Sequence, residues 1–485
     1  MAKPTTRANG ASAPRVALMT FGDERDYMWD GYFRGLTEPR HSEARDYLGG
    51  LPLDLLAFDE VARSKTEIDR QVAELQSAGA EALFAHTPCW ATPNLAVRAI
   101  QALDLPTVVM TSTSAATHGM VGMLATAGTL GQIGLDHMRV RDDFGAPVFE
   151  EEVLPFFRAA AARARLRGRV MGLFGGRSLG IDTGTFDPMQ WRAQFGVDVN
   201  HIDQLEIVRR AELIDPDRVA SMMEWAKGAF ASIDFDGKKL TEEKLAFQLR
   251  CYLANKDINA EQGLDFISVK CMTELSDHYV PQCISAALMP SPFDGEGVKQ
   301  TCSMSCEADG DGALSMEMLK LVSGGGATLF ADVSHMDTEK NMLYLPNCGG
   351  MCAWFAGRSA EASDNLQRIE LRPSVRPGGG ATTYFTAAPG PVTLARLYRV
   401  AGEYRMAILP GEAVQLSDED LAAFVRERGK HQLPTAFVQV EADLERFVEE
   451  YGSNHISGVA GLWVRELELL CEMLDVEPVV MDGDF

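Results

Sequence analysis

Two carboxylates and one imidazole stand where their chemistry can be used. Glu307 lies in an acidic segment before a predicted helix, and Asp332 lies inside or at the end of a strongly apolar strand, in the segment 330–333. A carboxylate in such a strand is costly unless it is paired or binds a cation. His455 follows a loop of small residues, 452–454. Two carboxylates and one neutral imidazole form a donor set that suits Mn²⁺, Mg²⁺ or a similar ion.

Each of these residues also has a structural interpretation. Carboxylates are favoured at a helix N-terminus, so segment 306–312 can cap the helix expected at residues 313–321. The same segment resembles a calcium-binding loop, but no bidentate glutamate follows at the required spacing. Ser453 or Asn454 can cap the helix expected at residues 461–474. The spacing alone does not show that the three residues meet.

A serine hydrolase is an alternative interpretation of the same residues. Residues 176–180 are Gly-Arg-Ser-Leu-Gly and follow a predicted strand, and Asp332 and His455 come later in the order found in α/β-hydrolases. The nucleophile of that fold needs a helix directly after the serine, whereas residues 181–188 are rich in turn formers. We therefore expect Ser178 to lie in a tight turn.

Strands and helices alternate in the region that must position the first loops. Apolar runs at residues 16–21, 53–58, 82–85 and 107–110 are separated by helical patterns, which predicts a doubly wound parallel sheet. Ligands bind beyond the carboxyl ends of such strands, so loops 21–25 and 86–90 are candidate site loops. The expected fold is α/β, with two doubly wound α/β N-terminal domains followed by a mixed α+β, β-rich C-terminal domain.

The chain of 485 residues exceeds what one hydrophobic core usually supports. We expect three domains. Residues 1–168 form the first, residues 169–321 form the second and carry Glu307, and residues 322–485 form the third and carry Asp332 and His455.

Composition excludes several classes of partner. The formal net charge of −24 disfavours nucleic acids and anionic membranes. No apolar run is long enough to span a membrane, and residues 1–14 lack the apolar core of a signal peptide. Nine cysteines without a C-x-x-C pair predict free thiols in a reducing cytoplasm. Their spacing does not fit a zinc finger, so we expect buried small residues.

Six short segments resemble the L-fucose isomerase family, within the L-fucose/L-arabinose isomerase superfamily. They occur in the family's order and together cover most of the chain. They are Thr87-Pro88-Cys89-Trp90, the turn at residues 175–181, the segment around Glu307, Phe330-Ala331-Asp332-Val333, the glycines at 378–380 with Tyr384, and Asn454-His455.

The resemblance implies a metal-dependent aldose–ketose isomerase. Glu307, Asp332 and His455 would bind the ion, which is usually Mn²⁺ and otherwise another divalent cation such as Mg²⁺ or Co²⁺. The ion would chelate O1 and O2 of an open-chain sugar, while Glu307 and Asp332 move a proton between C1 and C2 through a cis-enediol. The family also implies a homo-oligomer, a hexamer, in which Trp90 serves a neighbouring subunit.

The expected sugar contacts are Arg25, Trp90, Tyr384, Asn454 and Lys270. The resemblance implies a sugar like L-fucose or D-arabinose. Lys270 stands where the family commonly has glutamine, which favours an anionic sugar unless Lys270 pairs with Glu274 or Asp277. The same residues are also compatible with a sugar epimerase that uses this metal site, and with a non-catalytic sugar-binding protein.

Overall fold

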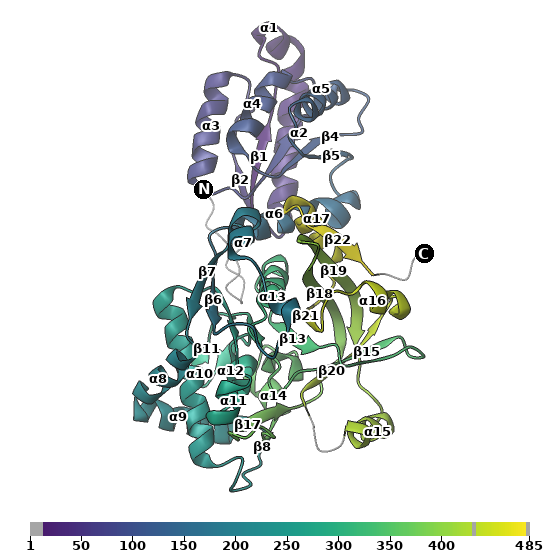
Figure 1. Ribbon diagram of the computed structural model, residues 1–485. Coiled ribbons are helices and arrows are strands. Elements are labelled where there is room, and N and C mark those ends of the chain that lie inside the picture. The colour runs from purple at the N-terminus through teal and green to yellow at the C-terminus, as the bar shows by residue number, and fades with distance from the viewer. Residues whose placement is uncertain (1–12, 429–432, 482–485) are drawn as a thin grey trace. The chain divides into compact units, whose positions relative to one another are not determined.

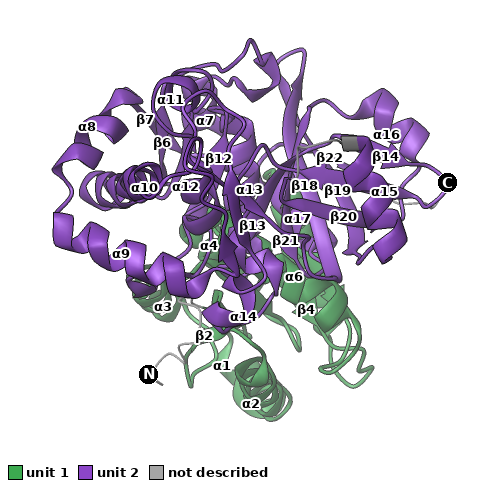
Figure 2. Cartoon of the chain, turned by 90° about the horizontal axis from the view of Figure 1, so that it is seen from below, with its two compact units in different colours: residues 1–164 green, residues 165–485 purple. Residues whose placement is uncertain are grey.

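The computed structural model describes residues 13–428 and 433–481 (Figure 1). It divides into two compact units, Met1–Ala164 and Arg165–Phe485 (Figure 2). The division falls in the last turn of helix α6 (Leu154–Leu166), close to the boundary expected at Gly168. The further division expected between residues 321 and 322 stays a prediction.

Unit 1 contains a five-stranded parallel sheet in the order β2-β1-β3-β4-β5. Its central strands are buried along nearly their whole length, as expected for parallel strands covered on both faces. The strands are β1 (Arg15–Thr20), β2 (Asp54–Ala57), β3 (Ala82–His86), β4 (Thr107–Thr111) and β5 (Met138–Arg141). The helices are α1 (Asp26–Met28), α2 (Arg34–Gly50), α3 (Lys65–Ser77), α4 (Pro93–Leu103), α5 (Gly119–Gln132) and α6.

The strand order reverses between β1 and β3. Loop 21–25 follows β1 and loop 87–90 follows β3, so the two expected site loops lie beyond the carboxyl ends of neighbouring strands. This topological switch point is the usual ligand-binding position of a doubly wound sheet.

Unit 2 begins with a four-stranded parallel sheet in the order β12-β9-β6-β7. Its strands are β6 (Val170–Phe174), β7 (Asp198–Ile202), β9 (Phe266–Val269) and β12 (Met304–Cys306). Its helices are α7 (Pro188–Gln194), α8 (Leu205–Leu213), α9 (Pro216–Ala229), α10 (Glu242–Gln262), α11 (Glu274–His278), α12 (Cys283–Leu288) and α13 (Gly310–Val322). Thr241 caps α10 at its start, and Gly263 ends it in a left-handed conformation.

The last third of the chain is rich in strands. Its main sheet has the order β13-β21-β18-β19-β20-β15-β14, with β22 paired to β19. These strands are β13 (Thr328–Asp332), β14 (His335–Asp337), β15 (Met342–Pro346), β18 (Gly390–Val400), β19 (Glu403–Ala413), β20 (Thr435–Val440), β21 (His455–Ala460) and β22 (Glu477–Val480). The helices are α14 (Ala362–Leu366), α15 (Asp418–Arg428), α16 (Leu444–Glu450) and α17 (Val464–Met473).

Two smaller sheets complete unit 2. One joins β17 (Ala381–Tyr384), β16 (Glu370–Pro373) and β8 (Ser232–Ile233), and the other joins β10 (Phe293–Asp294) and β11 (Gly297–Val298). Two parallel α/β sheets followed by a strand-rich part confirm the predicted fold class. Among the described residues, no helix is both long enough and apolar enough to cross a membrane.

The expected helix cap at Ser453 or Asn454 is wrong. Residues from His455 onward form β21, which pairs with β13 on one side and β18 on the other, and α17 begins only at Val464. The small residues Ser457 and Gly458 give this strand no clear alternation, so its position between β13 and β18, and not its propensity, makes it extended.

Candidate metal centre

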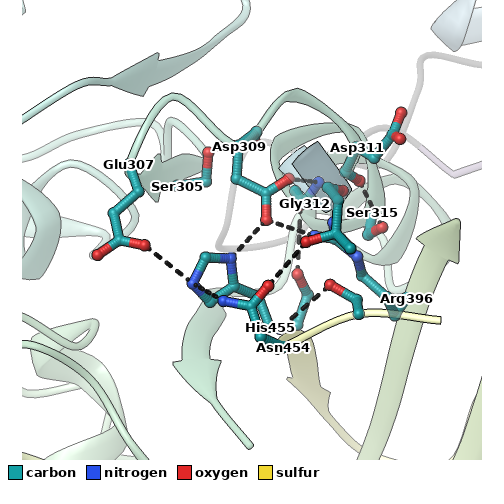
Figure 3. Close-up of polar contacts among 12 residues, drawn as sticks. Ser305, Glu307, Asp309, Asp311, Gly312, Ser315, Arg396, Asn454 and His455 are labelled. Carbon is teal, nitrogen blue, oxygen red and sulfur yellow. Dashed lines mark hydrogen bonds and ion pairs between the residues drawn. The ribbon is translucent and has the colours of Figure 1, made fainter. Parts of the chain in front are cut away.

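Glu307, Asp332 and His455 converge in unit 2. His455 Nε2 lies 3.2 Å from Glu307 Oε2 and 3.3 Å from Asp332 Oδ1. His455 is buried and Glu307 nearly so, while 38% of the Asp332 side chain is exposed. Figure 3 shows Glu307 and His455 directed at each other. Three residues that are distant in sequence therefore meet at one site. This site is open to solvent beside Asp332.

Strand register brings Asp332 and His455 together. Asp332 is the last residue of β13, and His455 is the first residue of the antiparallel β21, directly opposite it. Side chains of directly opposed residues lie on the same face of a sheet, about 5 Å apart at Cβ. The apolar run before Asp332 is thus the strand that delivers its carboxylate to the imidazole.

Glu307 arrives from another sheet of unit 2. It follows β12, and both Glu307 and Ala308 adopt left-handed backbone conformations, with φ of 63° and 55°. Residues with side chains adopt this region rarely, and such strain is concentrated at functional sites. The chain then enters α13, whose N-cap is Asp309. The two-residue turn directs the Glu307 carboxylate toward His455.

Asp309 holds the second ring nitrogen of His455. His455 Nδ1 is 2.7 Å from Asp309 Oδ2, and Asp309 Oδ1 accepts the backbone N–H of Gly312 as a helix cap. The cap agrees with the structural interpretation of segment 306–312, whereas the contact with His455 was not expected. Burial alone would raise the pKa of Asp309, but Arg396 and His455 lower it to about 2. Asp309 therefore stays ionised.

Arg396 neutralises this buried carboxylate. It lies in the middle of β18, and it is fully buried. Its Nη1 donates to Asp309 Oδ2 at 2.6 Å, and its Nη2 donates to the carbonyl oxygen of Thr183 at 2.7 Å. Arg396 was not predicted from the sequence, although an arginine inside the apolar run 392–400 signals a buried ionic partner.

The electrostatic surroundings of His455 favour positive charge. Burial alone would lower the pKa of His455, but hydrogen bonds with Asp309, Asp332 and Glu307 raise it well above the ordinary value. Because Asp309 occupies Nδ1, Nε2 is the nitrogen that faces Glu307 and Asp332. A carboxylate bound to the far nitrogen of a histidine is the usual arrangement behind a metal-binding imidazole.

The chemical types of these donors, two carboxylates and one imidazole, suit a divalent cation. Adjacent donors on an ion with bonds of about 2.1 Å are about 3 Å apart, close to the separations between His455 Nε2 and the two carboxylates. In the structure the carboxylates contact the imidazole directly, and the described residues contain no group of three or more His, Cys, Asp or Glu side chains arranged to hold a metal ion. A bound cation would replace these direct contacts.

Asn454 completes this end of the site. Its Nδ2 lies 3.0 Å from His455 Nε2, and its Oδ1 accepts the hydroxyl of Thr183 at 2.8 Å. Thr183 belongs to a short 3₁₀ turn, Asp182–Gly184. This hydrogen bond orients the amide so that its N–H groups face the centre.

Lys270 and Tyr384 also belong to unit 2, but neither contacts the three predicted ligands. Lys270 follows β9, and its Nζ pairs with Glu274 Oε1 at 2.7 Å, as its structural interpretation predicts. Tyr384 ends β17 beneath the guanidinium of Arg372, whose Cζ is 3.5 Å from the ring centroid. The charge of Lys270 is thus matched within the protein.

Arg25 and Trp90 lie in unit 1. Arg25 forms a bidentate pair with the buried Asp23 in the loop after β1. Trp90 follows β3 and packs against the apolar cluster around Trp29. Both residues therefore lie at the switch point of the first sheet.

Ser178 lacks the surroundings of a hydrolase nucleophile. Its side chain is fully buried, and its hydroxyl donates to the carbonyl oxygen of Met272 at 2.8 Å. The following residues form turns and a single 3₁₀ turn instead of the required helix. The serine hydrolase interpretation is contradicted.

The sequence matches two domains of one family. Residues 41–168 match the first N-terminal domain of L-fucose isomerase, and residues 345–482 match its C-terminal domain. A sulfoquinovose isomerase from Alkalicoccus urumqiensis is 24% identical over 64% of this chain and 66% of that protein.

Two further relatives align over more of the chain. L-fucose isomerase from Vibrio vulnificus is 23% identical over 81% of this chain and 79% of that protein. L-fucose isomerase from Bacteroides thetaiotaomicron is 23% identical over 89% of this chain and 86% of that protein. Together with the two domain matches, these relatives show that the chain belongs to the L-fucose isomerase family of sugar isomerases.

Proposed function

We propose that this chain is a metal-dependent aldose–ketose isomerase. The observation that carries the proposal is the convergence of Glu307 and Asp332 on His455 Nε2 while Asp309 holds Nδ1. The names of the relatives, L-fucose isomerase and sulfoquinovose isomerase, support the reaction class.

Glu307, Asp332 and His455 would hold the ion, and Mn²⁺ suits their oxygen and nitrogen donors. When bound, such an ion would polarise the carbonyl and the neighbouring hydroxyl of an open-chain sugar, which acidifies the hydrogen on the carbon that bears the hydroxyl. Asp309 and Arg396 keep the imidazole oriented from behind. The buried network thus prepares one face of the site before substrate binds.

The two carboxylates move the proton. A base beside C1 and C2 removes the proton from C2 and returns it to C1 through a cis-enediol, while a second proton passes from the C2 hydroxyl oxygen to the C1 carbonyl oxygen. Glu307 lies in a strained turn after β12, and the more exposed Asp332 lies at the end of β13. The two carboxylates therefore reach the sugar from different elements. Asn454 is placed to donate to a sugar oxygen, because Thr183 fixes its amide.

The substrate in this proposal is an aldose like L-fucose or D-arabinose, or a related anionic sugar. The test is ketose formation from a panel of aldoses by chelator-treated protein, before and after addition of Mn²⁺. Activity should be absent in the chelator and return with the ion. Reaction in D₂O should label the transferred position with deuterium whenever the proton exchanges with solvent.

Glu307→Gln and Asp332→Asn should each lower kcat by about 10²–10⁴-fold. Asp337→Asn is a matched control, because Asp337 lies in the nearby strand β14 and contacts its own turn rather than His455. Full activity in the chelator would contradict the proposal. An epimeric aldose as the sole product would replace it with the epimerase.

A further inference from the structure

Unit 2 contains a cavity of about 600 Å³ that none of the residues of the candidate metal centre lines. Its wall includes the small sheet formed by β8, β16 and β17, and also Cys348. Such a volume suits a sugar-sized ligand. Neither the donor set nor the proton transfer described above accounts for it.

Asn347 connects the cavity to the two strands that carry the carboxylates. Its buried amide donates to the carbonyl oxygen of Phe330 in β13 and lies 4.0 Å from the thiol of Cys306 in β12. Phe330 is two residues before Asp332, and Cys306 directly precedes Glu307. Cys348, the residue after Asn347, lines the cavity. Through Asn347, the Cys348 end of the cavity is therefore connected to the strands that carry Glu307 and Asp332.

Strand β17, whose Thr382 lines the cavity, also carries the expected sugar contact Tyr384. Arg372 is paired in register with Thr382, and Glu370 is paired with Tyr384. Alternate residues of a strand share a face, so Tyr384 lies on the face that turns Arg372 and Thr382 into the cavity.

One arginine of the cavity wall is not matched by an anion. Arg372 is neutralised by Glu370, with Nη2 and Oε2 2.6 Å apart. Arg376 also lines the cavity, and its guanidinium makes no hydrogen bond or ion pair with any residue that the structure describes. The wall has a second carboxylate, Asp234, which is exposed. A half-buried guanidinium without an anionic partner can bind the anionic group of a ligand through two parallel hydrogen bonds.

We infer that Arg376 binds an anionic group at the end of the sugar substrate remote from C1 and C2. The inference rests on the proposed isomerase function and gives its substrate class. C1 and C2 lie at the metal centre, and the carbon chain extends past Cys348 and Tyr384 into the cavity. A sulfonate or a carboxylate on the last carbon meets the guanidinium there. The charge of Lys270, already matched by Glu274, is not needed.

The test compares two sugars that differ only at the last carbon. Sulfoquinovose carries a sulfonate there, and quinovose carries hydrogen. With Mn²⁺ present, the unmodified protein should prefer sulfoquinovose in kcat/KM by at least about tenfold. Arg376→Gln should lower kcat/KM for sulfoquinovose about 10–100-fold and leave quinovose within about twofold. Glucuronate, assayed alongside, distinguishes a carboxylate from a sulfonate.

Arg376→Lys should keep part of the preference for sulfoquinovose over quinovose, because the positive charge remains but the two-pronged hydrogen-bond geometry of the guanidinium is lost. Arg368→Gln is the matched control, since Arg368 is an arginine outside the cavity that contacts the backbone of Asp364. Equal losses on both sugars, or no preference in the unmodified protein, would overturn the inference. If neither sugar is converted while another aldose of the panel is, the inferred substrate class is overturned but the isomerase proposal stands. If no aldose of the panel is converted, the isomerase proposal fails, and weaker equilibrium binding of sulfoquinovose to Arg376→Gln than to the unmodified protein would still support the anion site.

Discussion

Asp309 has two roles that a single substitution can separate. It caps α13 through the backbone of Gly312, and it holds His455 Nδ1. Asparagine is an equally good N-cap, but it removes the negative charge behind the imidazole. Asp309→Asn should therefore keep the helix and lose the orientation of the histidine.

For Asp309→Asn we expect Mn²⁺ affinity to fall about 10–100-fold, the usual loss when the partner behind a metal-binding histidine is removed. Calorimetric titration of the chelator-stripped chain measures it. Asp311→Asn is the matched control: Asp311 is equally buried in the same turn but contacts Tyr404 and Arg399. An unchanged affinity in Asp309→Asn would show that Asp309 is only a cap.

Asp311 supplies a pH-dependent contribution to stability. Burial raises its pKa from 3.8 to about 7, against the opposing effect of Arg396 and Arg399. The folded state therefore keeps a proton that the unfolded state has lost between these two pH values. The stabilisation is complete below pH 3.8 and declines as the pH rises to about 7.

Asp311→Asn should remove this decline. Relative to the unmodified chain, the free energy of unfolding of the variant should increase from about pH 4 to pH 7, by up to about 4 kcal/mol. Urea unfolding of both proteins across this range measures the difference. A difference that stays constant with pH would mean that Asp311 does not titrate there.

At the scale of elements, the first turn of α13 must lie very close to β18 and β13. A Cβ atom on Gly312 would lie 2.6 Å from Arg396 Nη1 and 2.6 Å from the Phe330 ring. Ser457 donates to the carbonyl oxygen of Gly312, and Ser315 accepts the backbone N–H of Leu397. These contacts fix the position of α13, which carries Asp309 at its start, relative to the strands that carry Arg396 and His455.

Gly312→Ala should displace Arg396 and Asp309, destabilise the chain by about 1–3 kcal/mol and weaken Mn²⁺ binding. Unfolding and metal titration of one preparation measure both effects. Gly228→Ala in α9 is the control, because no atom lies within 4 Å of its added Cβ and alanine favours a helix. Normal metal affinity in Gly312→Ala would show that the close approach is not required.

Elements with local signals could be predicted from the sequence. The apolar strand that ends in Asp332 and the acidic turn before α13 can both be recognised from a short run of consecutive residues. The ion pair between Asp309 and Arg396 could not be predicted, since it depends on how α13 packs against β18. Strand β21 was not predicted because Ser457 and Gly458 carry no strand pattern, and neighbouring strands determine its conformation.

At the scale of the whole molecule, the family resemblance leads us to expect a homo-oligomer. On α5, Met120, Val121 and Leu124 are each at least one-third exposed, and their spacing places them on one side of the helix. Such an apolar patch is typical of an interaction surface. The resemblance predicts six copies of the 52.9 kDa chain.

Light scattering after size exclusion should give about six times the chain mass. Leu124→Lys should reduce the assembly, whereas Leu213→Lys, at an exposed leucine of α8, should not. A monomer at micromolar concentration would contradict the expected assembly without affecting the metal centre.

The metal centre is tested most directly by a Mn²⁺ titration of the chelator-stripped chain, followed by the electron paramagnetic resonance signal of the free ion. We expect one tightly bound ion per chain. In Glu307→Gln and in Asp332→Asn, that affinity should fall by at least about 100-fold. Undiminished binding in both variants, or no binding to the unmodified chain, would contradict a metal centre at Glu307, Asp332 and His455.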